Sequence, residues 1–204
     1  MTVSTGARSL IDTLVPHERA RRLAWYALLA LLGTAVLALS AKVKVPLWPV
    51  DASLQTLALF TIAAAFGRRL AVATLVLYLV EGALGLPVFQ GTPERGIGLA
   101  YMVGPTGGYL IGFVLAAYMV GWAADKGWDR RPFRLFGVML VAELVLLALG
   151  ALWLAYLFGF DKAFAYGVGP FIVTDLIKIA LAAAIVPALW RLVRHLRPTA
   201  TDDT

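Results

Sequence analysis

The chain has 204 residues, of which 61% are hydrophobic and only 15% charged, and its mean hydropathy is +0.82. Soluble domains carry about 25% charged residues, so this composition excludes a soluble globular protein and indicates a membrane protein. The net charge of +6 does not predict a nucleic-acid partner, because the basic residues cluster at the ends of apolar segments. Without cysteine, the chain has neither a disulfide framework nor a thiolate metal site.

Six apolar runs approach the roughly 20 residues with which a helix spans a bilayer. The third contains Glu81 and the fifth contains Glu143. We therefore predict an all-α polytopic membrane protein with six transmembrane helices. In chain order, these helices are expected at residues 23–41, 52–67, 70–86, 107–124, 135–158 and 170–190.

Basic residues are distributed unevenly between the two ends of these helices, thirteen on one side and four on the other. Because Lys and Arg concentrate in cytoplasmic loops, we expect both termini in the cytoplasm and a location in the cytoplasmic (inner) membrane. The four are Lys42, Lys44, Arg95 and Lys162. The thirteen are Arg8, Arg19, Arg21, Arg22, Arg68, Arg69, Lys126, Arg130, Arg131, Arg134, Arg191, Arg194 and Arg197.

The first apolar run ends in "ALSA", which is similar to a signal-peptidase site. Its length of about 19 residues exceeds the 7 to 15 of a signal peptide. We expect it to stay in the protein as an uncleaved helix.

The segments on the less basic side are long and rich in Gly, Pro and aromatic residues. They cover residues 42–56, 85–108 and 159–170. Their backbone donors and acceptors need partners that lipid does not supply, so we expect them to fold over the helices as a cap. "GPTGGYLIG" (104–112) places glycines at the start of the fourth helix, which suits close approach of the backbone to a ligand or to a neighbouring helix.

Asp175 and Lys178 lie inside the last apolar run, where each charge costs about 2.5 to 3.5 kcal/mol on insertion scales. Three residues apart on a helix, they share a face. If Pro170 marks the first turn, they lie roughly 8 and 12 Å into the helix, with side chains leaning toward its outward end. The carboxylate accepts hydrogen bonds and the ammonium donates them, so the pair suits a polar group with both N–H and C=O. A self-satisfied ion pair and a lysine that only anchors the helix are the structural alternatives.

Other polar and aromatic side chains are expected near this outward pocket. Glu81 and Glu143 are candidates for a proton or cation site, or else are neutral carboxyl groups or lie near a helix end. Trp48 and Tyr101 offer apolar faces with polar tips. The remaining candidates for substrate binding are Gln55, Thr56, Tyr78, Gln90, Thr106 and Tyr109.

Four stretches together resemble a known family. They are "VPLWPVDASLQTLALF", "LYLVEGALGLPVF", "GPTGGYLIGF" and "GPFIVTDLIKIALAA". In this order they resemble the substrate-binding, or S, components of energy-coupling-factor (ECF) transporters, specifically the biotin-specific BioY family, over about residues 20–195. Three places depart from the family pattern: Asp51 and Ala52 follow "PV", and Glu81 and Glu143 stand at positions that are usually apolar.

The resemblance implies a six-helix biotin-binding membrane domain over residues 21–195, between cytoplasmic tails at 1–20 and 196–204. It implies high-affinity capture of biotin outside and uptake across the membrane, alone or with a coupling subunit and two ATPases, or as a homo-oligomer. On the matching positions, Asp175 would accept from the ureido N–H and Lys178 would donate to the ureido C=O. Biotin and the lipid bilayer are the expected partners, and neither a cofactor nor enzymatic chemistry is expected.

Three other functions stay open at this point. A secondary carrier would couple proton or sodium movement through Glu81 or Glu143, although the chain lacks the internal repeat of many such carriers. An intramembrane enzyme would use Asp175 as acid or base, but Lys178 holds it ionised and no second carboxylate accompanies it on its helix. A binding-only sensor or storage protein is the third. The chain lacks G-x-x-x-x-G-K-[ST], so it does not itself hydrolyse ATP by the P-loop route.

Overall fold

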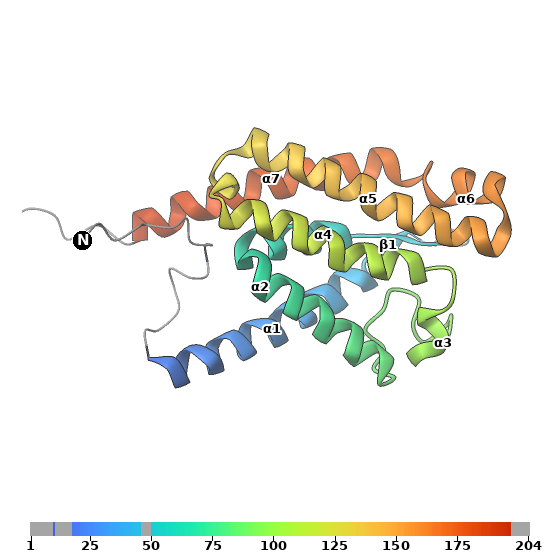
Figure 1. The fold of residues 1–204 in the computed structure, drawn as a ribbon, viewed down its shortest axis with the longest axis horizontal. Coiled ribbons are helices and arrows are strands. Elements are labelled where there is room, and N and C mark those ends of the chain that lie inside the picture. The colour runs from blue at the N-terminus through green and yellow to red at the C-terminus, as the bar shows by residue number, and fades with distance from the viewer. Residues whose placement is uncertain (1–9, 11–17, 46–49, 197–204) are drawn as a thin grey trace, which may run out of the picture.

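The computed structural model describes residues 10, 18–45 and 50–196. It is predominantly helical, as predicted, with one short antiparallel pair of strands (Figure 1). In chain order the elements are α1 (Arg19–Lys42), β1 (Lys44–Val45), β2 (Ala52–Ser53), α2 (Gln55–Ala83), α3 (Gly98–Met102), α4 (Gly107–Asp125), the 3-10 helix η2 (Trp128–Arg130), α5 (Pro132–Phe158), α6 (Phe160–Gly167) and α7 (Phe171–Leu196).

Helix α2 folds back on itself at Gly67. This residue has φ 74° and ψ 171°, a conformation that glycine adopts without steric cost. The Gln55 side-chain amide at the start of α2 donates to the Tyr78 hydroxyl near its end, at 2.6 Å. In a straight helix these residues would be about 35 Å apart, so α2 consists of two antiparallel arms (Figure 1). Arg68 and Arg69 follow the turn and place it at the basic end of the molecule.

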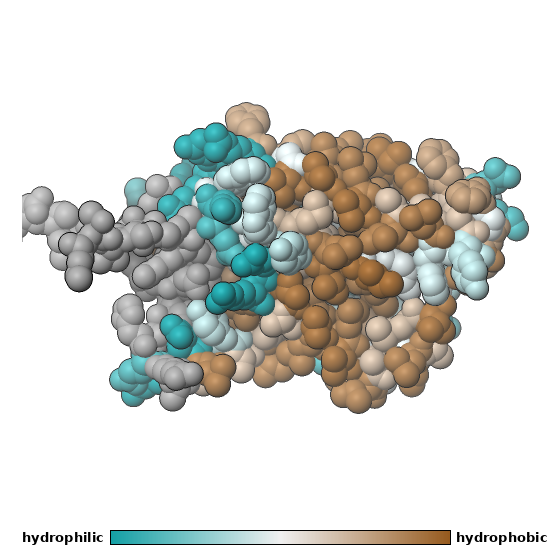
Figure 2. All heavy atoms as spheres, in the orientation of Figure 1, coloured by the Kyte–Doolittle hydropathy of each residue, from teal (hydrophilic) through white to brown (hydrophobic). Residues whose placement is uncertain are grey.

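Five helices in the described part of the chain are long and apolar enough to cross a membrane, with α2 counted once. Figure 2 shows the broad hydrophobic band that they form, with hydrophilic residues toward the two ends. The predicted helices at 52–67 and 70–86 correspond to the two arms of α2, and the count of six spanning helices stays a prediction. The predicted start at residue 52 was wrong, because Ala52 and Ser53 pair with Val45 and Lys44 as strand β2.

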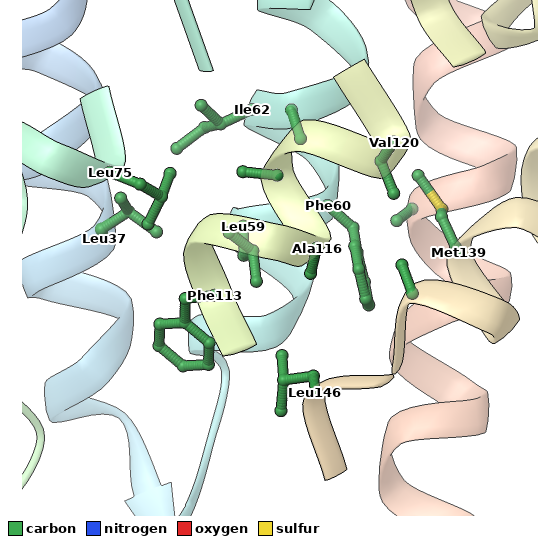
Figure 3. Packing of buried hydrophobic residues seen from close by; sticks show 14 of the residues in the cluster. Leu37, Leu59, Phe60, Ile62, Leu75, Phe113, Ala116, Val120, Met139 and Leu146 are labelled. Carbon is green, nitrogen blue, oxygen red and sulfur yellow. The ribbon is translucent and has the colours of Figure 1, made fainter. Parts of the chain in front are cut away.

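Helix α4 occupies the middle of the bundle and packs against both α2 and α5. A Cβ atom on Gly108 would lie 2.4 Å from the carbonyl oxygen of Leu149, and one on Gly112 would lie 3.0 Å from Cα of Leu146. The glycines at the start of α4 therefore allow close contact with α5, as small residues do between membrane helices. The buried side chains around this contact include Leu59, Phe60, Phe113, Ala116, Val120, Met139 and Leu146 (Figure 3).

The loop between α4 and α5 is attached to α7 at the basic end. The Trp190 indole N–H donates to Oδ2 of the buried Asp129, and the Arg130 guanidinium lies 4.4 Å from the centre of the Trp190 ring. Burial raises the pKa of Asp129 from its ordinary value of 3.8 to about 6. Asp129 and Arg130 of η2 thus hold the basic end of α7 in place through Trp190.

We predict that Gly108→Ala destabilises the protein by about 1 to 3 kcal/mol, the usual cost of overpacking. The new methyl group would meet a backbone oxygen, which cannot move away as a side chain can. Gly137→Ala in α5 is the matched control, because a Cβ there meets nothing within 4 Å. Thermal unfolding in detergent should show a lower Tm for the first variant only, and equal Tm values would contradict this account of the α4–α5 contact.

We predict that Asp129 makes the protein less stable as pH rises from 4 to 7. The folded protein holds this proton at pH values where the unfolded chain has lost it, because the folded pKa of about 6 lies above 3.8. This contribution to stability is fully present below pH 3.8 and is lost as the pH rises above about 6. Tm measured across this range should fall less steeply in Asp129→Asn, and parallel curves would show that Asp129 does not titrate in this way.

Candidate functional site

A cavity of about 50 Å³ lies among the starts of α2, α4 and α7, the middle of α5 and the loops at residues 50–53 and 89–106. Seven of the eight predicted binding residues line it. The eighth, Tyr78, lies behind Gln55, accepts its amide N–H at 2.6 Å and donates to the Val88 carbonyl at 3.0 Å. The seven are Gln55, Thr56, Gln90, Thr106, Tyr109, Asp175 and Lys178.

The two charges of α7 form an ion pair inside this cavity. Lys178 Nζ lies 2.7 Å from Asp175 Oδ1, and the Thr56 hydroxyl donates to the same oxygen at 3.5 Å. The two residues are only 3% and 7% exposed. The ion pair that the sequence left as a structural alternative is therefore present, and it forms part of the cavity wall.

Glu143 brings a second carboxylate to the pair. It lies near the middle of α5 with 3% exposure, so the explanation that it sits near a helix end was wrong. Its side chain lines the cavity beside the Asp175 carboxyl group, and no N–H or hydroxyl group among the described residues donates to either of its oxygens. Although α7 itself lacks a second carboxylate, α5 supplies one.

Glu81 is placed differently. It lies two residues before the end of α2, accepts a hydrogen bond from the Thr34 hydroxyl at 2.9 Å, and does not line the cavity. Across the described ranges, no group of three His, Cys, Asp or Glu side chains could hold a metal ion.

Aromatic rings form the apolar wall of the cavity. Phe89 stacks on Tyr101 with ring centres 4.9 Å apart, and the ring centres of Tyr109 and Phe171 are 6.2 Å apart. The Tyr109 hydroxyl donates to the Gly167 carbonyl at 2.6 Å, which ties α4 to the end of α6. The sequence reasoning did not select Phe89 or Phe171, although both stand inside the motifs "GLPVF" and "GPFIVTD". Trp48, which it did select, lies outside the described residues.

Residues of the segments 42–56 and 85–108 line the cavity, and Asp51 holds these two segments together. Its side chain is 1% exposed and lies 2.7 Å from the Arg95 guanidinium and 3.3 Å from Lys44 Nζ. Gln90 donates to the Asp51 carbonyl at 2.9 Å and accepts from the Ser53 hydroxyl at 3.0 Å. Asp51 thus links the β1–β2 segment to the 85–106 loop.

The sequence model of the BioY family matches residues 12–195 of this chain. The chain belongs to the BioY family. It is 37% identical over 161 residues to the probable biotin transporter BioY of Pyrococcus horikoshii, covering 79% of this chain and 93% of the relative. It is also 37% identical over 161 residues to the biotin transporter BioY of Thermotoga maritima, covering 78% and 92%.

The fold of this BioY-family chain matches a solved structure described as the S-component for biotin from an ECF-type ABC transporter. The TM-score is 0.74 at 20% identity, over 86% of this chain and 95% of the other. At 20% identity this match shows a shared fold and nothing about function. The helices that carry the cavity are therefore arranged as in an S-component.

We predict that Asp175→Asn lowers stability by about 3 to 5 kcal/mol, because it leaves the Lys178 charge buried without its partner. Lys178→Met should lower stability by a similar amount, because it leaves the Asp175 charge buried without its partner. The double variant should cost less than the sum of the two, because it removes both charges together. A double-mutant cycle on thermal or denaturant unfolding measures this coupling.

The matched control for the buried pair is Arg21→Met, because Arg21 and Glu18 have the same three-residue spacing at 3.1 Å but are 73% and 70% exposed. Exposed pairs contribute little, so this change should leave stability nearly unchanged. Additive costs for Asp175→Asn and Lys178→Met would contradict the coupling.

Proposed function

We propose that this chain binds biotin with high affinity and takes it up across the cytoplasmic membrane as a transporter S component. The observation that carries the proposal is the buried Asp175–Lys178 pair in an aromatic-walled cavity of a BioY-family protein. Biotin transporter is also the printed description of relatives that share 37% of aligned residues with it. The role is binding and translocation, without a covalent step.

The cavity offers complementary groups to the two ends of the biotin bicycle. In this proposal the Asp175 carboxylate accepts from a ureido N–H, and the Lys178 ammonium donates to the ureido C=O. Both bonds are charge-assisted, which makes them stronger than bonds between neutral groups. The rings of Phe89 and Phe171 and the neighbouring tyrosines supply apolar contact for the sulfur-containing ring.

We further propose that both termini face the cytoplasm and that the capped cavity opens outward. The basic turn of α2 and the η2 segment lie at one end, and the capped cavity lies at the other. Energy would come from a membrane coupling subunit with two ATPases, or the chain would act alone or as a homo-oligomer. Glu143 in the cavity wall favours one alternative, an ion-coupled carrier of a small polar metabolite.

We predict that cells lacking other biotin routes take up radiolabelled biotin when they express the wild-type chain, and that Asp175→Ala combined with Lys178→Ala abolishes this uptake. The matched control is Asp161→Ala with Lys162→Ala. It removes the same two charges from exposed positions in α6, outside the cavity, and should leave uptake unchanged.

Equal uptake by the wild type and the cavity variant would refute the proposal. The same cells show which energy source drives uptake. Loss of uptake on ATP depletion supports an ATP-driven module, whereas loss on dissipating the ion gradient, with ATP intact, supports the carrier.

A further inference from the structure

Glu143 is the buried carboxylate in the cavity that neither the Asp175–Lys178 pair nor the ion pairs of Asp51 use. Both of its oxygens are buried, no N–H or hydroxyl group within the described part of the chain donates to them, and their polar neighbour is the carboxyl group of Asp175. A buried polar group in that condition bears its full desolvation cost, and an apolar residue of similar size would avoid it. The position therefore places a second buried carboxyl group beside Asp175, at a cost in stability that an apolar residue would avoid.

The location of Glu143 shows what could use these oxygens. It lines the cavity that Asp175 and Lys178 also line, and it lies close enough to both to interact with their charges. It approaches from α5, whereas the ion pair comes from α7. The helices thus bring two carboxylates and one ammonium to the cavity, and the loop residue Asp51 brings a third carboxylate that is paired with Arg95 and Lys44.

A cyclic urea presents one C=O between two N–H groups that point to opposite sides. Lys178 can serve the C=O and Asp175 can serve one N–H. The second N–H needs another acceptor, because a buried donor without a partner weakens binding. Asp175 Oδ1 already accepts from Lys178 and Thr56.

We propose that Glu143 accepts the second ureido N–H of the ligand and is a specificity-determining residue of this cavity. The inference rests on the proposed function, which requires a biotin-like ligand. It assigns a substrate contact to a third ionisable residue of the helices, so this chain would recognise the ureido ring by three side chains from two helices.

The test is calorimetric titration of the purified full-length chain in lipid nanodiscs. Its ligands are biotin and biotin methylated at one or the other ureido nitrogen. Glu143→Leu should weaken biotin binding by about tenfold or more, the effect of leaving a buried donor unpaired. Glu143→Gln keeps a carbonyl acceptor and should bind within about threefold of the wild type.

The methylated ligands identify the contact. Methylation at one of the two nitrogens should weaken binding to the wild type but weaken binding to Glu143→Leu much less, because the contact is already gone. Methylation at the other nitrogen should weaken binding to both proteins by similar factors.

Thermal unfolding of the ligand-free proteins separates an effect of each variant on biotin binding from an effect on the stability of the fold. Glu143→Leu should raise Tm by about 2 to 8 °C, because a buried carboxyl group beside that of Asp175 is removed. Glu81→Leu is the matched control. It removes another membrane-embedded glutamate that does not line the cavity, and it should leave biotin affinity unchanged. Glu143→Met serves as a second apolar variant if the leucine variant does not fold.

Biotin binding by both apolar variants within about twofold of the wild type would overturn the role of Glu143 while leaving the proposed function intact. Equal effects of each methyl group on wild type and variant would overturn it as well. If the wild type itself does not bind biotin, the proposed function fails and this inference fails with it.

Discussion

The structure depends on one constraint, which is that hydrocarbon offers no hydrogen-bond partners, so every polar group at membrane depth must find one inside the protein. The helices satisfy the backbone along most of the chain. Where the chain leaves helical geometry, it does so beside other protein groups. Residues 44–45 pair with residues 52–53, and the Lys42 ammonium donates to the carbonyls of Phe89 and Thr92 at 2.8 and 2.9 Å. The loops over the cavity thus fold against the protein because hydrocarbon cannot satisfy their polar groups, whatever part they take in ligand binding.

The same constraint explains why the cavity can recognise a polar ligand. Asp175 and Lys178 satisfy each other, so the protein tolerates two charges that would be costly alone. A ligand with both a donor and an acceptor can share these charges without leaving either unpaired. Glu143 differs because no N–H or hydroxyl group of the described residues donates to it, and its polar neighbour is another carboxyl group, that of Asp175. Its presence is best explained by something other than the stability of the protein.

The sequence allowed the charged pair and much of its surroundings to be predicted. Charges in an apolar run stand out because of their cost, and Gln55 and Thr106 were selected for their polar side chains beside predicted helix starts. The start of the fourth helix at Gly107 was predicted to the residue. These features follow from local composition.

Other features depend on contacts between distant residues, and the sequence does not show them. Ala52 and Ser53 extend an apolar run, so only pairing with residues 44 and 45 reveals a strand. Helix α5 is apolar on its lipid-facing side as well as its protein-facing side, and this removes the periodicity that would show Glu143 pointing inward. The partners of Asp51 lie on either side of it in the chain, at Lys44 and Arg95.

The cap and the helical wall of the cavity are held by different forces, and this difference indicates which part moves. A bicyclic ligand needs more than the present volume of about 50 Å³, since ligand pockets measure about 300 to 1,000 Å³. The contacts of Asp51 and Gln90 in the cap are ion pairs and hydrogen bonds, and Arg95 and Lys44 remain 35% and 26% exposed. Water can replace such contacts at small net cost. The helical wall of the cavity around Phe113 and Leu146 is apolar packing that water cannot replace, so entry of such a ligand requires the loops to move while the helices stay packed.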